Sequence, residues 1–333
     1  MNPVTSRILH TLLDHDGFVS GGQLSLELQV TRSAVWKHVA QLREAGYEIE
    51  AVSGRGYRLA GLTGTPVAEE VRPLLETSAF GRSFVFLETS ESTNLHARAL
   101  ARDGAVEGTV VVADSQTGGR GRMRRAWVSP PGVNLYCSIV LRPQVLSVRI
   151  PEIPLVAAAA IHGALRDECP ELVTAIKWPN DILSGGRKLC GILCEMESEP
   201  DFTHFVVVGF GVNVNLDPVP GELQGIATSA AIETGKSFSR ARILAAVLNR
   251  FESLYAEWLG NEDLGFLLPL LERHAWLQGR QVRIEQFSRI LTGTVVGLSP
   301  QGHLLLENGD GTVTSVNSGE AHLQSINDQT RPA

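Results

Sequence analysis

The residues with the clearest chemical potential lie in one short segment, residues 115–127. This segment interleaves glycines with arginines: Gly118, Gly119 and Gly121 with Arg120, Arg122, Arg124 and Arg125. Glycine lets a backbone approach a ligand closely, and guanidinium groups bind phosphates or carboxylates through paired hydrogen bonds. We therefore expect a loop that closes over an anionic ligand, although a solvated basic loop would have the same composition. It is not a Walker phosphate loop, because no Gly-Lys-Ser/Thr follows.

A second group of candidate residues spans positions 177–193. Lys188 opens an apolar strand, where its ammonium group would neutralise a phosphate or carboxylate at the edge of a site. Asp181 follows Pro179-Asn180 at a tight turn, where it would bind Mg²⁺ or stay ionised as a base. Each residue alone is more often part of a surface ion pair. Together with the arginine-rich loop they indicate a single site for phosphate chemistry.

A third and weaker signal is the run from Gly209 to Asn213. Glycines within a strand often mark a close approach of the backbone. The amide of Asn213 both donates and accepts hydrogen bonds, as the edge of an adenine or an amide requires.

Residues 1–62 are expected to form a winged helix-turn-helix domain. Apolar residues at helical spacing predict three helices, with Thr31 as N-cap of the third, and residues 47–59 predict a two-stranded wing. The third helix would enter a major groove, and Arg55 and Arg58 of the wing would meet phosphates. The predicted DNA-binding residues are Thr31, Arg32, Ser33, Trp36, Lys37 and Arg55. A small helical protein–protein module is the alternative.

The remaining chain predicts an α+β protein with two further domains. Residues 63–79 are a linker, and within it 67–75 is expected to be a short connecting helix. Residues 80–274 combine short apolar strands with helices and few βαβ crossovers, which favours a mixed or antiparallel sheet packed against helices. Residues 275–327 are expected to contain four short strands separated by glycine turns, at 281–284, 291–297, 303–307 and 312–316. This pattern predicts a small β-barrel.

Composition limits the classes of function. The net charge of −7 over 333 residues means that any DNA binding must come from a local basic patch. The four cysteines form no CxxC pair or zinc set, which predicts a reduced, cytoplasmic setting. No signal peptide is expected. The longest apolar stretch, near residues 153–165, is shorter than the ~20 residues of a membrane span.

The motifs together resemble the bacterial biotin–protein ligases. The resemblance is carried, in order along the chain, by Ser92–Asn94, the arginine-rich loop and its continuation Trp127–Ser138, Lys177–Asp181, Arg187–Gly191, Gly209–Asn213 and Ala227–Ser229. The winged N-terminus makes the chain similar to the bifunctional members, which are also biotin operon repressors. The resemblance implies a class II synthetase-like mixed sheet. It also implies an SH3-like C-terminal domain at residues 279–323, which include the run Ser318-Gly319-Glu320. One departure is Arg124, where the family commonly has glycine.

The resemblance also implies roles for individual residues. Biotin would lie among Ser92, Thr93, Asn94, Gln116, Gly119, Arg120, Gly121, Arg122, Lys188 and Gly191. The adenylate would be held by Arg122, Arg124, Arg125, Trp127, Asn180, Lys188, Gly211 and Asn213. Lys188, Arg122 and Asp181 would be catalytic, and residues 216–227 would form a second loop over adenine. The reaction would use ATP and Mg²⁺, with Asp181 as the one candidate metal ligand from the protein.

The implied partners are biotin carboxyl carrier protein, operator DNA and a second copy of the chain when the adenylate is bound, with no membrane. Three alternatives stay open at this point. They are a lipoate–protein ligase, a ligand-sensing repressor with an inactive catalytic domain, and a ligase whose winged domain only orders the active site.

Overall fold

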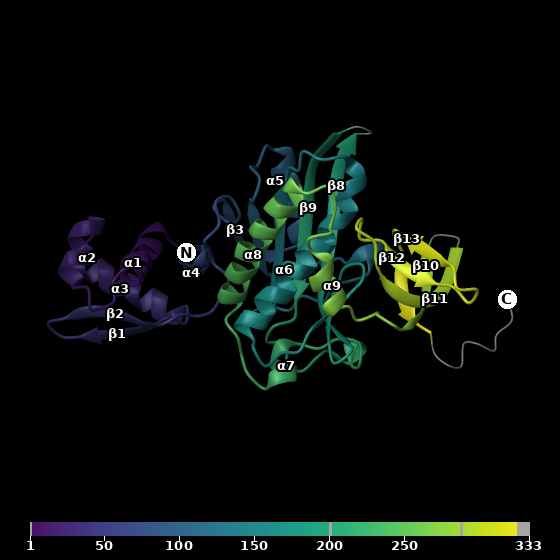
Figure 1. Ribbon diagram of the computed structural model, residues 1–333. Coiled ribbons are helices and arrows are strands. Elements are labelled where there is room, and N and C mark those ends of the chain that lie inside the picture. The colour runs from purple at the N-terminus through teal and green to yellow at the C-terminus, as the bar shows by residue number, and fades with distance from the viewer. Residues whose placement is uncertain (1, 200–201, 287–288, 325–333) are drawn as a thin grey trace. The chain divides into compact units, whose positions relative to one another are not determined.

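The computed structural model describes residues 2–199, 202–286 and 289–324 (Figure 1). The chain forms two compact units. The first runs to Leu74 and includes Ser239–Arg242, and the second contains residues 75–238 and those from 243 onward. The predicted linker over 63–79 is therefore divided between the two units. The last residues of the predicted C-terminal domain, 325–327, lie outside the described residues.

The first unit has the predicted order of three helices and a hairpin. It contains α1 (Pro3–Leu13), α2 (Gly21–Leu28), α3 (Arg32–Glu44), β1 (Glu48–Val52), β2 (Gly56–Gly61) and α4 (Ala68–Val71), followed by a 3₁₀ turn at Arg72–Leu74. Ile8, Leu24 and Val35, one from each of the first three helices, are fully buried in a common core. The hydroxyl of Thr31 accepts a hydrogen bond from the Ala34 amide at 3.2 Å, which confirms it as the N-cap of α3.

Two local features of the first unit depend on single residues. Gln29, at the C-terminal end of α2, has φ 55° and ψ 39°, a left-handed conformation that costs a residue with a Cβ roughly 1 kcal/mol. The buried carboxylate of Glu70 on α4 accepts hydrogen bonds from the amides of Thr63 and Gly64, at 3.1 and 2.8 Å. The start of the predicted linker is thereby fixed to α4 within this unit.

The second unit is built on a seven-stranded mixed sheet. The strands, in sheet order, are β3 (Phe84–Ser90), β4 (Val110–Gln116), β5 (Leu135–Leu141), β9 (Phe202–Val212), β8 (Arg187–Glu199), β7 (Asp181–Ser184) and β6 (Ala175–Lys177). Only β3 and β4 pair in parallel, so the predicted mixed sheet is confirmed. The sequence predicts a tight turn at Asp181, whereas in the structure Asp181 is the first residue of β7.

Helices cover both faces of this sheet. The helices are α5 (Thr93–Arg102), α6 (Ile153–Glu168), α7 (Ala230–Thr234), α8 (Arg240–Gly260) and α9 (Leu268–Arg273). Ala97 of α5 packs against Val111 and Val140 on one face. Their neighbours along the strands, Val110 and Ile139, point to the opposite face and are also fully buried. In Figure 1, α6 and α8 lie side by side, and an ion pair joins Asp167 of α6 to Arg250 of α8.

One helical stretch, Ser147–Glu168, is long and apolar enough to meet the length and composition test for a membrane span. Within it, 72% of the most apolar window is buried inside the protein. Its apolar residues are therefore explained by packing in the core.

The C-terminal segment forms a five-stranded antiparallel sheet. The strands β10 (Gln281–Gln286), β11 (Arg289–Leu298), β12 (Leu304–Glu307), β13 (Val313–Val316) and β14 (Glu320–Leu323) follow the order β13-β12-β11-β10-β14. Four of these strands were expected, and β14 was not. Barrel closure of the SH3 type remains a prediction.

A buried histidine on α6 gives the second unit a pH-dependent stability. The ring centroids of His162 and His274 are 4.2 Å apart, and His162 Nδ1 lies 2.8 Å from Thr174 Oγ1. Burial, with the charges of His274, Arg166 and Arg250, lowers the pKa of His162 from 6.5 to about 4. The unfolded chain therefore takes up this proton near pH 6.5 and the folded chain only near pH 4. Stability should fall as the pH falls through this window, by at most ~3 kcal/mol.

The prediction is that His162→Gln flattens the dependence of the urea midpoint on pH between 7 and 5. His303→Gln is the matched control, because His303 is only partly buried, and it should leave the slope as in wild type. Equal slopes in His162→Gln and wild type would assign the acid sensitivity to other groups.

Candidate active site

A cavity of about 510 Å³ lies in the second unit, bounded by the sheet, the arginine-rich loop and the C-terminal strands. Of the predicted ligand-binding and catalytic residues, those lining it are Ser92, Thr93, Asn94, Gln116, Arg120, Gly121, Arg122, Arg125, Trp127, Asn180, Asp181, Lys188, Gly191, Gly211 and Asn213. Gly119 and Arg124 are not among the lining residues. The cavity thus brings together segments separated by more than a hundred positions in the sequence.

One end of the cavity is formed by neutral polar groups at the start of α5. The Oε1 atom of Gln116 accepts a hydrogen bond from the Thr93 amide at 2.9 Å, and its Nε2 donates to Ser129 at 3.0 Å. Thr93, Asn94 and Ser92 are each less than 7% exposed. This end can therefore recognise a small polar ring through directed hydrogen bonds.

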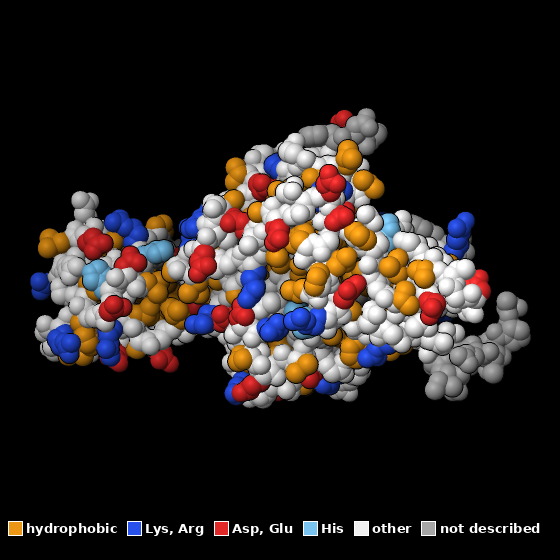
Figure 2. Space-filling model, viewed as in Figure 1, with side chains coloured by type: hydrophobic (Ala, Val, Ile, Leu, Met, Phe, Trp, Pro, Cys, Tyr) orange, Lys and Arg blue, Asp and Glu red, His pale blue; other side chains and the backbone are white. Residues whose placement is uncertain are grey.

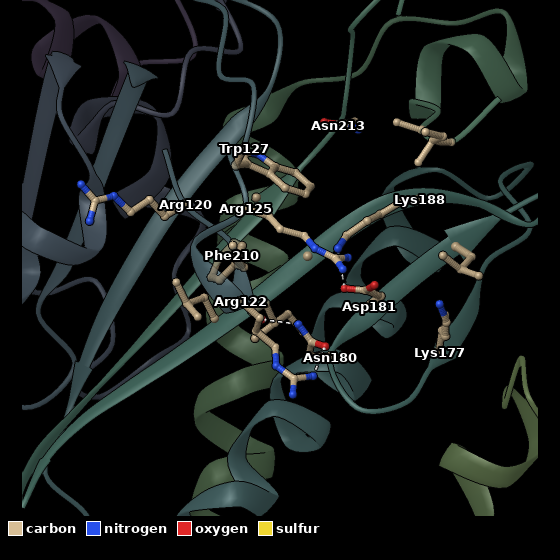
Figure 3. A pocket seen from close by; sticks show the side chains of 18 of the residues that line it. Arg120, Arg122, Arg125, Trp127, Lys177, Asn180, Asp181, Lys188, Phe210 and Asn213 are labelled. Atoms are coloured by element: carbon tan, nitrogen blue, oxygen red, sulfur yellow. Dashed lines mark hydrogen bonds and ion pairs between the residues drawn. The ribbon is translucent and has the colours of Figure 1, made fainter. Parts of the chain in front are cut away.

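The other end carries the charged groups. Lys188 Nζ lies 2.7 Å from Asp181 Oδ1 and 5.6 Å from the ring centroid of Trp127. Figure 3 shows Lys188 and Asp181 pointing toward each other, whereas Arg120 points away from this group. The side chain of Arg120 instead lies 3.5 Å from Glu91. The charged end therefore contains Lys188 and Asp181, whereas the side chain of Arg120 is directed toward Glu91.

The arginine-rich loop is held against other parts of the second unit. Arg122 donates to Asn180 Oδ1 at 3.0 Å and to the carbonyl oxygen of Gly319 at 3.3 Å. Arg125 pairs with Glu320 of β14 at 2.5 Å. Burial alone would raise the pKa of Glu320, but the hydrogen bond and charge of Arg125 outweigh it and hold that pKa below its ordinary value. The loop is thus fastened over the cavity by the C-terminal strands.

Two residues of this loop have unusual backbone conformations. Met123 and Arg124 have φ of 54° and 59°, in the left-handed region that residues with a Cβ rarely adopt. Glycine at position 124 would relieve this strain.

The glycines of the central strands make room for neighbouring side chains, whereas the sequence suggested a close approach of the backbone to a ligand. A Cβ on Gly209 would overlap Asn94, and a Cβ on Gly211 would overlap the indole of Trp127. A Cβ on Gly191 would lie 3.0 Å from both Trp127 and Lys188. These glycines give room to the side chains that form the cavity wall, so their direct approach to a ligand is not required.

Asn213 also supports the wall. Its Nδ2 donates to the Thr228 carbonyl at 2.9 Å, and its Oδ1 accepts from Asn134 at 3.3 Å. The second loop is joined to the site through the backbone, since the Lys188 amide donates to Ile226 and the Thr228 amide donates back to Lys188. Residues of this loop, Leu216, Leu223, Gly225, Ile226 and Ala227, line the cavity.

The sequence reading missed several lining residues. They include Leu183, Gly186, Trp276, Glu320, Ala321 and Leu323. Only Glu320 had a recognisable sequence signal, as part of the C-terminal Ser-Gly-Glu run. These residues reach the cavity because β14 and the segment around Trp276 pack beside the sheet. Burial raises the pKa of the neighbouring Cys190 thiol, which argues against a thiolate nucleophile in this wall.

The candidate DNA interface lies at the N-terminal end of α3 and on the wing. Thr31, Arg32, Ser33, Trp36 and Lys37 are all exposed, Trp36 to 64%. On the face shown in Figure 2, acidic and basic side chains are interspersed. On this face the charges thus form no extended basic surface.

The two arginines of the wing have different environments. The guanidinium of Arg55 lies 4.3 Å from the ring centroid of Phe18, and that of Arg58 lies 5.1 Å from it. Arg58 is also paired with Glu50 at 2.7 Å. Its charge is thus already partly neutralised by a neighbouring strand.

Comparison with known proteins agrees with this arrangement. The biotin/lipoate A/B protein ligase family matches residues 87–213, a helix-turn-helix domain matches 4–58, and the biotin protein ligase C-terminal domain matches 278–323. These matches define a ligase of the biotin/lipoate class that carries a helix-turn-helix domain.

Relatives and solved structures narrow the class. The chain is 39% identical over 296 residues to the bifunctional ligase/repressor BirA of Bacillus subtilis (strain 168), covering 88% of this chain and 90% of that protein. Identity to BirA of Escherichia coli (strain K12) is 31% over 318 residues, covering 95% and 96%. The biotin protein ligase of Aquifex aeolicus, solved with biotin and ATP, superposes with a TM-score of 0.64 at 30% identity, covering 73% of this chain and 99% of that one. The chain belongs to the biotin protein ligase family.

Proposed function

We propose that this protein activates biotin with ATP to biotinyl-5'-AMP and transfers biotin to a lysine of biotin carboxyl carrier protein. We also propose that it represses transcription of biotin synthesis genes in response to biotin. The observation that carries the enzymatic proposal is the cavity itself. It joins a neutral polar end at Thr93 and Gln116 to a charged end at Lys188 and Asp181, under a loop fastened by Arg122.

In the first step the biotin carboxylate attacks the α-phosphorus of ATP and pyrophosphate leaves. The reacting groups are both anions, so the main task of the protein is to place them and neutralise their charge. Lys188 and Arg122, which both line the cavity, are the cations that would neutralise this charge. In the second step the amine of the carrier lysine attacks the mixed anhydride and AMP leaves, so no nucleophile from the ligase is needed.

The charged end also fits a requirement for Mg²⁺. Within residues 2–199, 202–286 and 289–324, no group of three His, Cys, Asp or Glu residues could hold a metal ion alone. Mg²⁺ is commonly bound through one or two carboxylates together with substrate phosphates and water, and Asp181 supplies one such carboxylate. When bound, the ion would neutralise phosphate charge. Asp181 would also be placed to accept the proton of the attacking carrier lysine.

The enzymatic proposal is tested by mass spectrometry of protein incubated with biotin and MgATP. We expect a mass that corresponds to the protein with tightly bound biotinyl-AMP. Adenylation of lipoate in preference to biotin would support a lipoate–protein ligase instead. Biotinylation of an acceptor peptide would exclude a sensing repressor with an inactive catalytic domain.

The repressor proposal rests on the exposed N-terminal end of α3 and on the matched helix-turn-helix domain. Two such domains in a dimer would read a palindromic operator. We propose that the adenylate-bound state favours this dimer. A footprint on the chain's own promoter region that is identical with and without biotin and ATP would contradict the coupling, and no binding would favour a winged domain that serves only the active site. The four free cysteines fit a reduced cytoplasmic setting for these partners.

The wing gives a specific prediction for DNA binding. Arg55→Ala should lower the slope of log K against log[salt] by about one, because one phosphate contact is lost. Arg58→Ala is the matched control in the same hairpin, and its effect should be smaller because Glu50 already partly neutralises Arg58. The two slopes are measured by titrating operator DNA at several salt concentrations. A larger change of slope in Arg58→Ala than in Arg55→Ala would mean that Arg58, and not Arg55, contacts the phosphate.

A further inference from the structure

The carboxylate of Glu233 on α7 joins the strand that carries Lys188 to the end of the second loop, residues 216–227. Glu233 Oε1 accepts a hydrogen bond from Thr228 Oγ1 at 2.5 Å and another from the Arg187 guanidinium at 2.7 Å. Thr228 directly follows the loop, and Arg187 directly precedes Lys188 on β8. The side chains of Glu233, Thr228 and Arg187 are not among those that line the cavity. Any effect of Glu233 on a ligand therefore passes through its neighbours.

The backbone beside Glu233 connects the same two segments. The Lys188 amide donates to the carbonyl oxygen of Ile226 at 2.8 Å, and the Thr228 amide donates to the carbonyl oxygen of Lys188 at 3.0 Å. Lys188 and Ile226 both line the cavity. The two backbone bonds and the two bonds to Glu233 thus fasten one end of the loop to the first residues of β8.

The bond between Thr228 and Glu233 is difficult to replace. Thr228 is fully buried, so water does not compete for its hydroxyl. The Glu233 side chain is 18% exposed. Hydrogen bonds to an ionised acceptor are stronger than those between neutral groups, and a buried hydroxyl without an acceptor is unfavourable. Loss of the Glu233 carboxylate should therefore loosen this end of the loop.

The base of the loop is closed independently of Glu233. Ser229 Oγ donates to the carbonyl oxygen of Leu216, at the start of the loop, at 2.7 Å. It also accepts a hydrogen bond from the Ile232 amide at 3.1 Å, and Ser229 is fully buried. A change at Glu233 should therefore release the loop from β8 without opening its base.

We infer that Glu233 is a positioning residue for ATP, because it fastens the second loop to the strand that carries Lys188. The inference rests on the proposed function, in which ATP occupies the charged end of the cavity, and adds a residue to it. A site that is complete only part of the time binds its ligand with an affinity lowered by that fraction. Releasing the loop should consequently raise KM for ATP, whereas saturating ATP should restore the complete site.

The test is biotin-dependent pyrophosphate exchange at varied ATP, together with calorimetric titration of biotin in the absence of ATP. Glu233→Ala should raise KM for ATP about tenfold, the usual effect of one hydrogen bond to a charged group, with kcat and the Kd for biotin within about twofold of wild type. Glu233→Gln keeps an oxygen that accepts from Thr228. It should raise KM only about threefold, because neutral hydrogen bonds are about half as strong.

Thr228→Val removes the hydroxyl, nearly keeps the shape of the side chain and completes a double-mutant cycle with Glu233→Ala. The double variant should raise KM for ATP no further than Glu233→Ala alone. Additive effects, or an unchanged KM in Glu233→Ala, would overturn the inference. A parallel loss of biotin affinity or of kcat would also overturn it and assign Glu233 a merely structural role.

Glu171→Ala is the matched control, because Glu171 forms an exposed ion pair at 2.6 Å with Lys236, just after α7. It should leave KM for ATP and the Kd for biotin as in wild type. If the wild-type chain showed no biotin-dependent exchange at all, the proposed function would be overturned, and not only the positioning role of Glu233.

Discussion

Lys188→Ala is expected to lower the rate of biotinyl-AMP formation by at least about 100-fold. Removing one preorganised group that stabilises transition-state charge typically costs this much or more. Lys188 is the ammonium group paired with Asp181 at 2.7 Å in the cavity. Its loss removes the neutralising charge and also leaves the Asp181 carboxylate to repel the incoming phosphates. Both effects act on the step in which charge is concentrated at the α-phosphorus.

The measurement is biotin-dependent exchange of labelled pyrophosphate into ATP. Lys236→Ala is the matched control, because Lys236 forms an exposed ion pair with Glu171 and neither residue lines the cavity. It should exchange at the wild-type rate. Lys188→Arg keeps the charge and should lose less activity than Lys188→Ala. If Lys188→Ala exchanged pyrophosphate at the wild-type rate, Lys188 would have no role in adenylate formation.

Much of the fold is predictable because long elements carry repeated local signals. Helix α3 shows its apolar face at Val35, Val39 and Leu42, and all three are buried in the structure. Strands β7, β12, β13 and β14 contain four residues each, a length at which the hydrophobic period is a weak signal, and of these only β12 and β13 were expected. Their pairing is decided by the neighbouring strands, which a local pattern does not reveal.

The candidate site is predictable in its residue types and less so in its contacts. Lys188, Arg122 and Asn180 are identified because cations and amides beside glycines and a proline turn are unusual for a core. That Arg122 reaches Asn180, and the carbonyl of Gly319 in the C-terminal segment, depends on tertiary packing over large sequence separations. Gly209 shows the same limit. Its sequence signal indicates a close approach, but only the structure shows that Asn94 is the approaching group.

Arg122→Gly is expected to shorten the lifetime of bound biotinyl-AMP by at least about 100-fold. Hydrogen bonds to charged groups contribute ~1.5–3 kcal/mol each, and Arg122 makes two of them, to Asn180 and to Gly319. Glycine removes both and adds backbone freedom to the loop, so the closed state that excludes water becomes less populated. The lifetime is measured by forming labelled adenylate on the protein and following its release after a chase with unlabelled biotin.

Arg124→Gly is the matched control, because it makes the same substitution two positions away in the same loop. Arg124 has φ 59° and does not line the cavity, so glycine there relieves strain without removing a bond that fastens the loop. This variant should hold the intermediate at least as long as wild type. If both variants released it equally fast, loop flexibility rather than the Arg122 contacts would control retention. If Arg122→Gly held it as long as wild type, the loop would not act as a clamp.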